Sequence, residues 1–92
     1  MSGKLVGAVL DRPDLSATEK LVLVTLADYA AADGSSIYPS LDTITRRSAL
    51  NRRTCQRTLS LMEERGFLTR WRSGGHHTTQ YRLPTARLFA VE

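Results

Sequence analysis

Residues 40–66, SLDTITRRSALNRRTCQRTLSLMEERG, constrain this chain most, because they contain two helix starts, a short turn and a helix stop. Ser40 and Asn51 are residue types that accept a hydrogen bond at the start of a helix, so each predicts a cap. Gly66 follows a periodic apolar run and predicts the end of the second helix. The stretch therefore predicts two helices, at about 41–47 and 51–65, joined by a turn at 48–50.

Two further helices and three strands are predicted around this pair of helices. Apolar residues spaced four apart predict a short helix over Lys4–Leu10, and Ser16 with Glu19 forms a capping box that starts a longer helix. We expect the longer helix to stop at Asp33-Gly34 and to contact more than one neighbour through its wide apolar stripe. Strand-like residues predict a brief strand at 37–38, then a β-hairpin with strands at 67–72 and 78–83 around a turn at 73–77.

The order of these elements predicts a fold that is mainly α with a small β-hairpin, an α+β fold. It consists of three core helices, a short N-terminal helix and a sheet of two or three strands. We expect one domain over residues 1–92, with its core at about 14–83 and an apolar tail at 84–92. No apolar run is long enough to cross a bilayer, and the chain has a single cysteine, so we expect a cytoplasmic protein without membrane contact.

Cations are unevenly distributed along the chain. Residues 1–45 contain three cations and six carboxylates, a net charge of −3, whereas residues 46–92 contain ten arginines and three glutamates, a net charge of +7. Arginine is favoured where a flat, forked donor meets a phosphate or a guanine edge. The second half is therefore expected to face an anionic partner, unless its arginines only form a solvated surface.

The helix that starts at Asn51 has two unlike faces. A helical projection places four residues on the side that we expect to face the core: Cys55, Thr58, Leu59 and Met62. The opposite side carries Arg53, Gln56, Arg57, Ser60 and Glu64. This outward face begins cationic and turns acidic at Glu63 and Glu64, as expected of a helix whose first two turns enter a DNA groove. A polar surface held by pairs such as Arg57–Glu64 is the alternative.

The sequence resembles the winged helix-turn-helix domains of bacterial, plasmid and phage replication initiators and small transcription regulators. Three stretches carry the resemblance, over about residues 14–83: LSATEKLVLVTLADYA, then IYPSLDTITRRSALNRRTCQRTLSLMEERGFL, then TTQYRL after a glycine-bearing turn. The resemblance implies binding of double-stranded DNA. The helix at 51–65 would lie in the major groove, and the hairpin, or wing, would lie on the backbone or the minor groove.

By position, the resemblance assigns major-groove contacts to Asn51, Arg52, Arg53, Gln56 and Arg57. It assigns phosphate contacts to Ser40, Thr43 and either Arg46 or Arg47. It assigns the wing to residues 72–78, which include Arg72, His76 and His77. Two residues depart from the family pattern, since Ala49 stands where the turn usually has glycine and Thr45 where a small alanine usually lies. A left-handed backbone at Ala49 would be about 1 kcal/mol less favourable than at a glycine.

Residues that suggest other chemistry have simpler explanations. His76 and His77 have no cysteine or carboxylate at ligand spacing, so we expect no metal. Cys55 lies on the core side and is expected to be a small apolar residue rather than a nucleophile. With no phosphate-cradling loop and no catalytic triad, we expect neither an enzyme nor a cofactor nor a small-molecule substrate.

Several apolar residues outside the predicted core point to other roles. Trp71, at the end of a strand, is expected to be a partly buried lid on the core, with stacking on an unpaired base as the alternative. Leu61 with Leu88, Phe89 and Val91 forms either a dimer surface or a tail that packs back on its own domain, and the sequence favours neither.

We expect a non-enzymatic protein that binds double-stranded DNA sequence-specifically, in transcription regulation or in phage or plasmid replication initiation. A homodimer on an inverted repeat fits this function, because two-fold proteins bind half-sites about one DNA turn apart. Two alternatives remain open: a protein–protein assembly adaptor whose basic face is only solvated, and a binder of RNA or single strands. Few aromatic residues lie in the basic half, which argues against the stacking surface that unpaired bases need.

Overall fold

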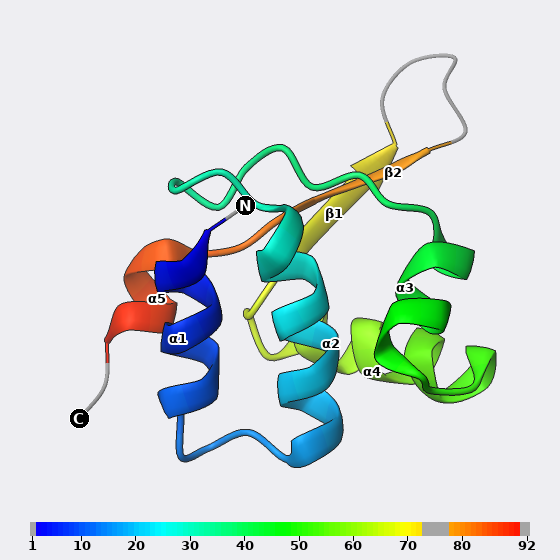
Figure 1. Cartoon of the computed structure of the whole chain (residues 1–92), viewed down its shortest axis with the longest axis horizontal. Coiled ribbons are helices and arrows are strands. Elements are labelled where there is room, and N and C mark those ends of the chain that lie inside the picture. The colour runs from blue at the N-terminus through cyan, green and yellow to red at the C-terminus, as the bar shows by residue number, and fades with distance from the viewer. Residues whose placement is uncertain (1, 73–77, 91–92) are drawn as a thin grey trace.

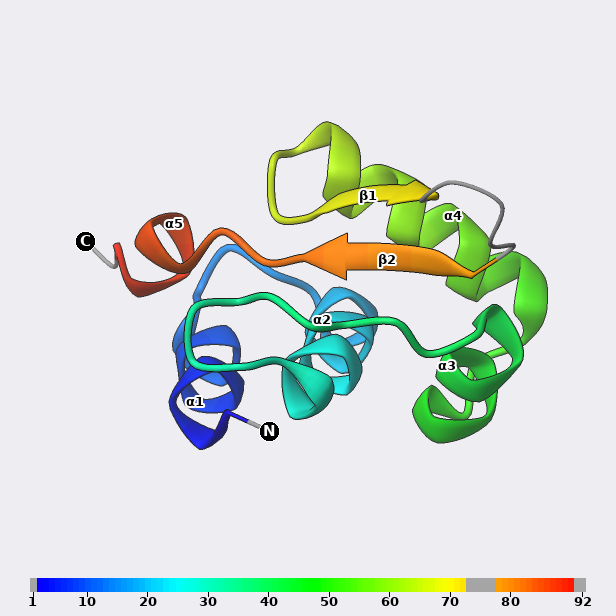
Figure 2. The same ribbon diagram turned by 90° about the horizontal axis from the view of Figure 1, so that it is seen from above.

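The computed structural model describes residues 2–72 and 78–90. In these ranges the chain forms five helices and two strands, in the order α1 (Gly3–Asp11), α2 (Ala17–Tyr29), α3 (Leu41–Ser48), α4 (Arg52–Glu64), β1 (Thr69–Arg72), β2 (Thr79–Arg82) and α5 (Thr85–Phe89). Figure 1 shows α1 and α2 antiparallel and side by side, with α3 on the other side of α2. Figure 2, the view from above, shows that the hairpin and α4 lie on one side of this layer of helices, and that α5 lies beside α1. The fold is mainly helical with a two-stranded antiparallel hairpin, as predicted.

Side-chain caps confirm the predicted helix starts. Ser16 Oγ accepts the Glu19 N–H at 3.2 Å, and the Ser16 N–H donates to Glu19 Oε1 at 2.8 Å, which completes the capping box of α2. Ser40 Oγ and Asn51 Oδ1 each accept the backbone N–H three residues on, at 3.1 Å and 2.8 Å. Each bond satisfies a donor that the first turn of a helix leaves unpaired, so the caps fix where α2, α3 and α4 begin.

The predicted end of α2, at Asp33-Gly34, lies too far along the chain. The helix ends at Tyr29, because Ala30 takes an extended backbone with φ −72° and ψ 145°. A separate turn follows, in which the Gly34 N–H donates to the carbonyl oxygen three residues back at 2.9 Å. Gly34 has φ +84°, and a Cβ there would lie 2.2 Å from the backbone oxygen of Leu83. Gly34 therefore shapes this turn against the chain after β2, and it does not end α2.

The turn between α3 and α4 adopts a backbone that glycine favours, although alanine occupies it. Ala49 has φ 59° and ψ 20°, in the left-handed region, and its N–H donates to Arg46 O at 3.3 Å. Asn51 caps α4 two residues later. Thr45, the other departure from the family pattern, has a buried hydroxyl oxygen with no hydrogen-bond partner among the described residues. Thr45 thus leaves an unsatisfied hydroxyl group within α3, and Ala49 leaves a strained backbone at the end of this helix.

The hairpin is shorter than predicted. The flanking residues 67, 68 and 83 leave the strands and are buried in the core instead. The strand expected at 37–38 is reduced to one bridge, in which the Tyr81 N–H donates to Ile37 O at 2.7 Å. Pro39 lies two residues further and has no N–H, so it cannot extend this pairing.

The core lies between α2 and the elements that surround it. The predicted core side of α4 is confirmed by four buried residues: Cys55, Thr58, Leu59 and Met62. The wide apolar stripe of α2 is confirmed too, since α2 contacts α1, α3 and α4. Trp71 is more exposed than a lid on the core would be, with 43% of its surface accessible, and it is not among the described residues that pack against the core. Trp71 lies on the face of β1 opposite to Arg70, which turns toward α4.

Residues 85–89 form a helix, α5, that the sequence did not predict. Leu88 is completely buried in the core, and α5 packs against α1. The assignment of Leu88 to an exposed dimer surface is therefore wrong, because this residue packs on its own domain. Phe89 is 51% exposed. Val91 lies outside the described residues.

A buried arginine joins the end of α1 to the end of α5. Arg12 Nη1 donates to Arg87 O at 2.6 Å and to Ala90 O at 3.2 Å, so it caps the carbonyl end of α5. Arg12 Nε and Nη2 donate to the Asp14 carboxylate at 2.9 and 2.8 Å. The guanidinium also lies 5.1 Å from the centre of the Phe67 ring. The hydrogen bond from Arg12 is the main reason that the pKa of Asp14 is lowered to about 2.

Replacing Ala49 by glycine should stabilise the domain, because glycine adopts the left-handed backbone without a steric conflict at Cβ. We expect Ala49→Gly to raise the free energy of unfolding by about 1 kcal/mol in urea denaturation. The control is Ala17→Gly, at an exposed position in the first turn of α2, where glycine is less favourable than alanine and should lower that free energy by up to about 1 kcal/mol. A similar loss in both variants would show that Ala49 is not strained.

Removing the Asp14 carboxylate should change how stability depends on acidic pH. The folded pKa of about 2 lies below the usual 3.8, so the carboxylate stabilises the fold above the usual value and stops doing so as pH falls through the folded value. We expect Asp14→Asn to melt below the wild type at neutral pH, with a difference that shrinks from about pH 5 to about pH 2. Circular dichroism melting curves over this range measure the difference. A gap that stays constant down to the lowest pH would contradict this account of the ion pair.

Candidate nucleic-acid interface

The first two turns of α4 carry the side chains predicted for the major groove. All of them are exposed: Asn51, Arg52, Arg53, Gln56 and Arg57. The left-handed turn at Ala49 and the cap at Asn51 set the direction in which α4 leaves α3. Cys55 and Leu59 are buried on the opposite side of the helix, so the cationic side faces outward.

The arginines on this face differ in what they contact. Arg52 forms an ion pair with Asp42 in the first turn of α3, and both side chains are more than half exposed. In the described part of the chain, neither Arg53 nor Arg57 pairs with a carboxylate. Two cations at the start of α4 are therefore free to meet an anion from outside the domain.

Three polar residues predicted to contact DNA already act as caps or support one. Ser40 Oγ accepts the Thr43 N–H and donates to Thr43 Oγ1 at 3.0 Å. Asn51 Oδ1 accepts the N–H of the third residue of α4, which leaves the amide NH₂ group for other contacts. These residues fix the starts of α3 and α4, so any contact with DNA would come in addition to this structural role.

The sequence left a choice between Arg46 and Arg47 for a phosphate contact, and the structure places them differently. Arg47 Nη2 lies 2.7 Å from Asp28 Oδ2, and its guanidinium lies 5.0 Å from the centre of the Tyr29 ring. The hydrogen bond to Asp28 raises the pKa of Arg47. Arg46 is exposed and has no ion pair among the residues that the structure describes. Arg46 is therefore the freer of the two cations.

Arg70 on β1 is a residue of this region that the sequence prediction missed. Its Nε donates to Glu63 Oε1 at 3.2 Å and its Nη2 donates to Ser60 Oγ at 2.9 Å, so it joins the hairpin to α4. Arg72 lies on the same face of β1 and is exposed. The signal in the sequence is the spacing of two between these arginines, which places both on one face of a strand.

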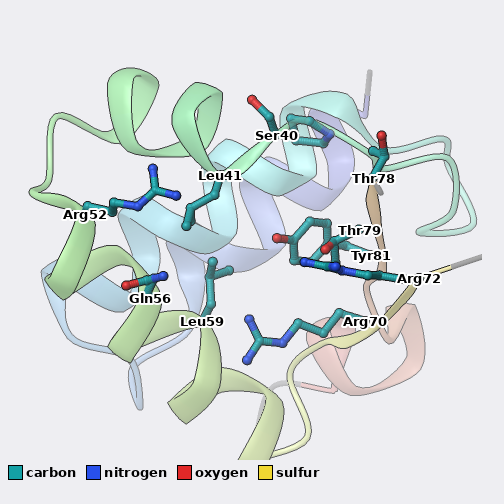
Figure 3. Close-up of a pocket in the computed structure, with 11 residues that line it drawn as sticks. Ser40, Leu41, Arg52, Gln56, Leu59, Arg70, Arg72, Thr78, Thr79 and Tyr81 are labelled. Carbon is teal, nitrogen blue, oxygen red and sulfur yellow. The ribbon is translucent and has the colours of Figure 1, made fainter. Parts of the chain in front are cut away.

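A pocket of ≈ 390 Å³ lies between the start of α3, α4 and the inner face of the hairpin. Figure 3 shows guanidinium groups from α4 and from β1 around it, with the Tyr81 hydroxyl turned toward its middle. Arg52, Gln56, Ser40 and Arg72 all line this pocket, whereas Arg53 and Arg57 are not part of the lining. The described lining residues are Pro39, Ser40, Leu41, Arg52, Gln56, Leu59, Arg70, Arg72, Thr78, Thr79 and Tyr81.

Tyr81 is the most buried polar side chain in this pocket, with 4% of its surface exposed. Burial raises the pKa of its phenol, and the charge of Arg70 opposes that shift without cancelling it. The hydroxyl therefore stays protonated at neutral pH and is able to donate a hydrogen bond.

Leu61 and Phe89, the other two residues predicted for a dimer surface, are exposed. Leu61 is 40% exposed on α4, and Phe89 is 51% exposed on α5. Single exposed apolar residues are common on monomeric proteins, so their exposure alone identifies no partner.

Within residues 2–72 and 78–90, no group of three or more histidine, cysteine, aspartate or glutamate side chains is placed to hold a metal ion. His76 and His77, predicted near the wing tip, lie outside these ranges, as does the rest of the turn at 73–77. Cys55 is buried in the core, as predicted. The helices of the described ranges are too short or too polar to cross a membrane.

Comparison with known proteins adds a family assignment. No curated protein matches the chain. A family model described as a helix-turn-helix domain matches residues 14–68, which are more than half of the chain and include α2, α3 and α4. The small hairpin that follows these helices is consistent with a winged helix. The chain therefore belongs to the helix-turn-helix domain family.

Proposed function

We propose that this helix-turn-helix domain binds double-stranded DNA sequence-specifically, with the first two turns of α4 in the major groove. The observation that carries the proposal is the exposed pair Arg53 and Arg57, which have no ion-pair partner among the described residues. A recognition helix presents its first turns to base edges, where guanidinium groups bond guanine or phosphate. Asn51, Arg52 and Gln56 lie on the same two turns and complete the proposed contacts.

The side chains have different roles in this proposal. A guanidinium that bonds both acceptors of guanine, or the Gln56 amide on adenine, contributes about 1–3 kcal/mol of discrimination between bases. Arg46 near the end of α3, with Ser40 and Thr43 at its start, positions the phosphate backbone without reading sequence. The hairpin, with Arg72, His76 and His77, contacts the backbone or the minor groove. No enzymatic activity is part of the proposal.

The proposed biological role is transcription regulation or phage or plasmid replication initiation, in the cytoplasm, by a homodimer on an inverted repeat. Selection of bound duplexes from a random pool tests specificity and symmetry together. A palindromic motif would support both the specific function and the homodimer, and a single half-site would support the function with a monomer. A pool without an enriched motif would overturn sequence specificity.

An assembly adaptor is the second candidate, and the exposed Leu61 and Phe89 are the residues with which it would contact a protein partner. The two candidates differ in their response to salt. A protein that neutralises several phosphates loses affinity steeply and linearly on a log–log salt plot. An adaptor would show little salt dependence with duplex and would lose its protein partner on substitution of Leu61 or Phe89 by alanine.

Removing Arg53 should weaken DNA binding and make it less specific, because the proposed reading face loses a guanidinium group that has no ion-pair partner among the described residues. We expect Arg53→Ala to lower the affinity for the selected duplex about tenfold, and to admit other base pairs at one position of the site. Fluorescence anisotropy at fixed salt measures both effects. The control is Arg82→Ala, which removes the same charge from an exposed position on β2. An unchanged affinity for the Arg53 variant would show that α4 is not the reading helix.

Removing the Asp42 carboxylate should strengthen duplex binding. Asp42 lies in the first turn of α3 and pairs with Arg52, so it places a negative charge beside the proposed DNA path. In Asp42→Asn this charge is lost and Arg52 becomes free, so we expect several-fold tighter binding and a log–log salt slope steeper by about one. Asp11→Asn, at the exposed end of α1, has the same charge change and should leave both quantities nearly unchanged. Equal gains in both variants would show that the tighter binding comes from net charge alone and not from the position of Asp42.

A further inference from the structure

The inner face of the hairpin gathers four polar side chains opposite α4. Arg70 pairs with Tyr81 across the strands and Arg72 pairs with Thr79, so strand alternation places all four on one face. All four line the ≈ 390 Å³ pocket, and α4 supplies Arg52 on the other side (Figure 3). The pocket therefore brings together side chains of the hairpin and of α4, which the proposed function treats as separate contacts with DNA.

The lining carries three guanidinium groups and, among the described residues, no carboxylate. Arg52 and Arg70 each have a carboxylate neighbour outside the lining, Asp42 and Glu63 respectively. Arg72 pairs with no carboxylate in the part of the chain that the structure describes. Like charges around one small volume repel each other, and an anion between them removes that repulsion, so the pocket suits an anion.

The neutral groups of the pocket suit an anion with several oxygen atoms. The protonated Tyr81 hydroxyl and the Thr79 hydroxyl add donors of fixed position to the forked guanidinium groups. The Ser40 hydroxyl is already committed, because its proton goes to Thr43 Oγ1. Phosphate oxygens accept charge-assisted bonds from arginine and ordinary bonds from hydroxyls at the same time.

We propose that this pocket binds one phosphate group, and that the phosphate belongs to the DNA backbone next to the groove that α4 reads. The inference rests on the proposed function, which already gives Arg72 a contact with the DNA, and adds Arg70, Thr79 and Tyr81 as further groups that hold the phosphate. Arg52 and Gln56 belong both to the pocket lining and to the exposed first turns of α4. A DNA strand on that face therefore adjoins the pocket. A free phosphate ion has the same chemistry, so the experiment includes it.

The test compares Arg72→Gln with Arg82→Gln. Both residues are exposed arginines in the hairpin, and the register places Arg82 opposite Thr69 on the outer face, away from the pocket. On the selected duplex, Arg72→Gln should lower affinity about tenfold and reduce the log–log salt slope by about one, with the selected motif unchanged. Arg82→Gln should change affinity less than about twofold at physiological salt. Thr79→Val should weaken binding without changing the slope, because it removes a donor and no charge.

A second measurement locates the phosphate. Duplexes in which one backbone phosphate at a time is replaced by a neutral methylphosphonate should reveal one position where wild-type affinity falls and the affinity of Arg72→Gln does not. Such a coupled loss shows that Arg72 and that phosphate act on each other, as in a double-mutant cycle. Circular dichroism melting curves of each variant establish that the substitution has not unfolded the domain.

The outcomes separate this inference from the proposed function. Wild-type binding to a selected duplex, with equal affinities for Arg72→Gln and Arg82→Gln, would overturn the pocket as a contact of the DNA backbone and leave DNA binding intact. A wild-type domain that binds no duplex would overturn the proposed function itself. Inorganic phosphate that shifts the amide NMR signals of Thr79 and Tyr81, in a domain whose duplex affinity ignores Arg72→Gln, would overturn the backbone as the source of the phosphate.

Discussion

Helix α2 contacts three other helices, and the rest of the fold is arranged around it. Val22, Leu23 and Leu26 on α2 are completely buried, with α1 on one side and α3 and α4 on the other. Full burial of a valine or leucine side chain stabilises a protein by about 1.5–3 kcal/mol, so α2 requires neighbours on more than one side. This requirement fixes where α4 lies, because α4 must turn Cys55, Leu59 and Met62 toward the same core.

Helix α4 is held by more than its apolar side. The left-handed backbone at Ala49 sets its start relative to α3, and Arg70 ties its last turns to β1 through Ser60 and Glu63. A binding surface built on a regular element that is fixed at both ends holds its side chains in a defined geometry. Arg53 and Arg57 differ from these tethered groups. Both are exposed and form no ion pair with the described residues, so both remain available to a ligand.

Local sequence signals were sufficient for the helix starts and for the two faces of α4. Caps such as Ser16 with Glu19 involve residues three apart, and the helical period alone sorts α4 into a buried and an exposed side. The signals failed where distant residues decide the structure. Helix α5 has five residues, and Arg12, more than seventy residues away, caps its carbonyl end, so no local pattern predicts it.

Contacts between residues that are far apart in the sequence also limit how much of the candidate site the sequence could predict. Composition and the resemblance identified the cationic start of α4, but not which arginines are paired within the domain. Arg47 meets Asp28 and Arg52 meets Asp42, and these choices depend on how α2, α3 and α4 pack. The pocket likewise depends on the hairpin folding over α4, which places Arg70 and Arg72 beside residues far from them in sequence.

The separation of α4 into a core side and an exposed side has a consequence for how such domains diversify. Arg53, Gln56 and Arg57 are exposed, and the buried contacts of α4 come from other positions of the helix. Under the proposed function, substitutions at these three positions alter the DNA target without removing a residue from the core. Under the proposed function, descendants of one ancestral chain can keep the same folding stability while recognising different DNA sequences, so new specificities can arise by single substitutions, each in a folded protein.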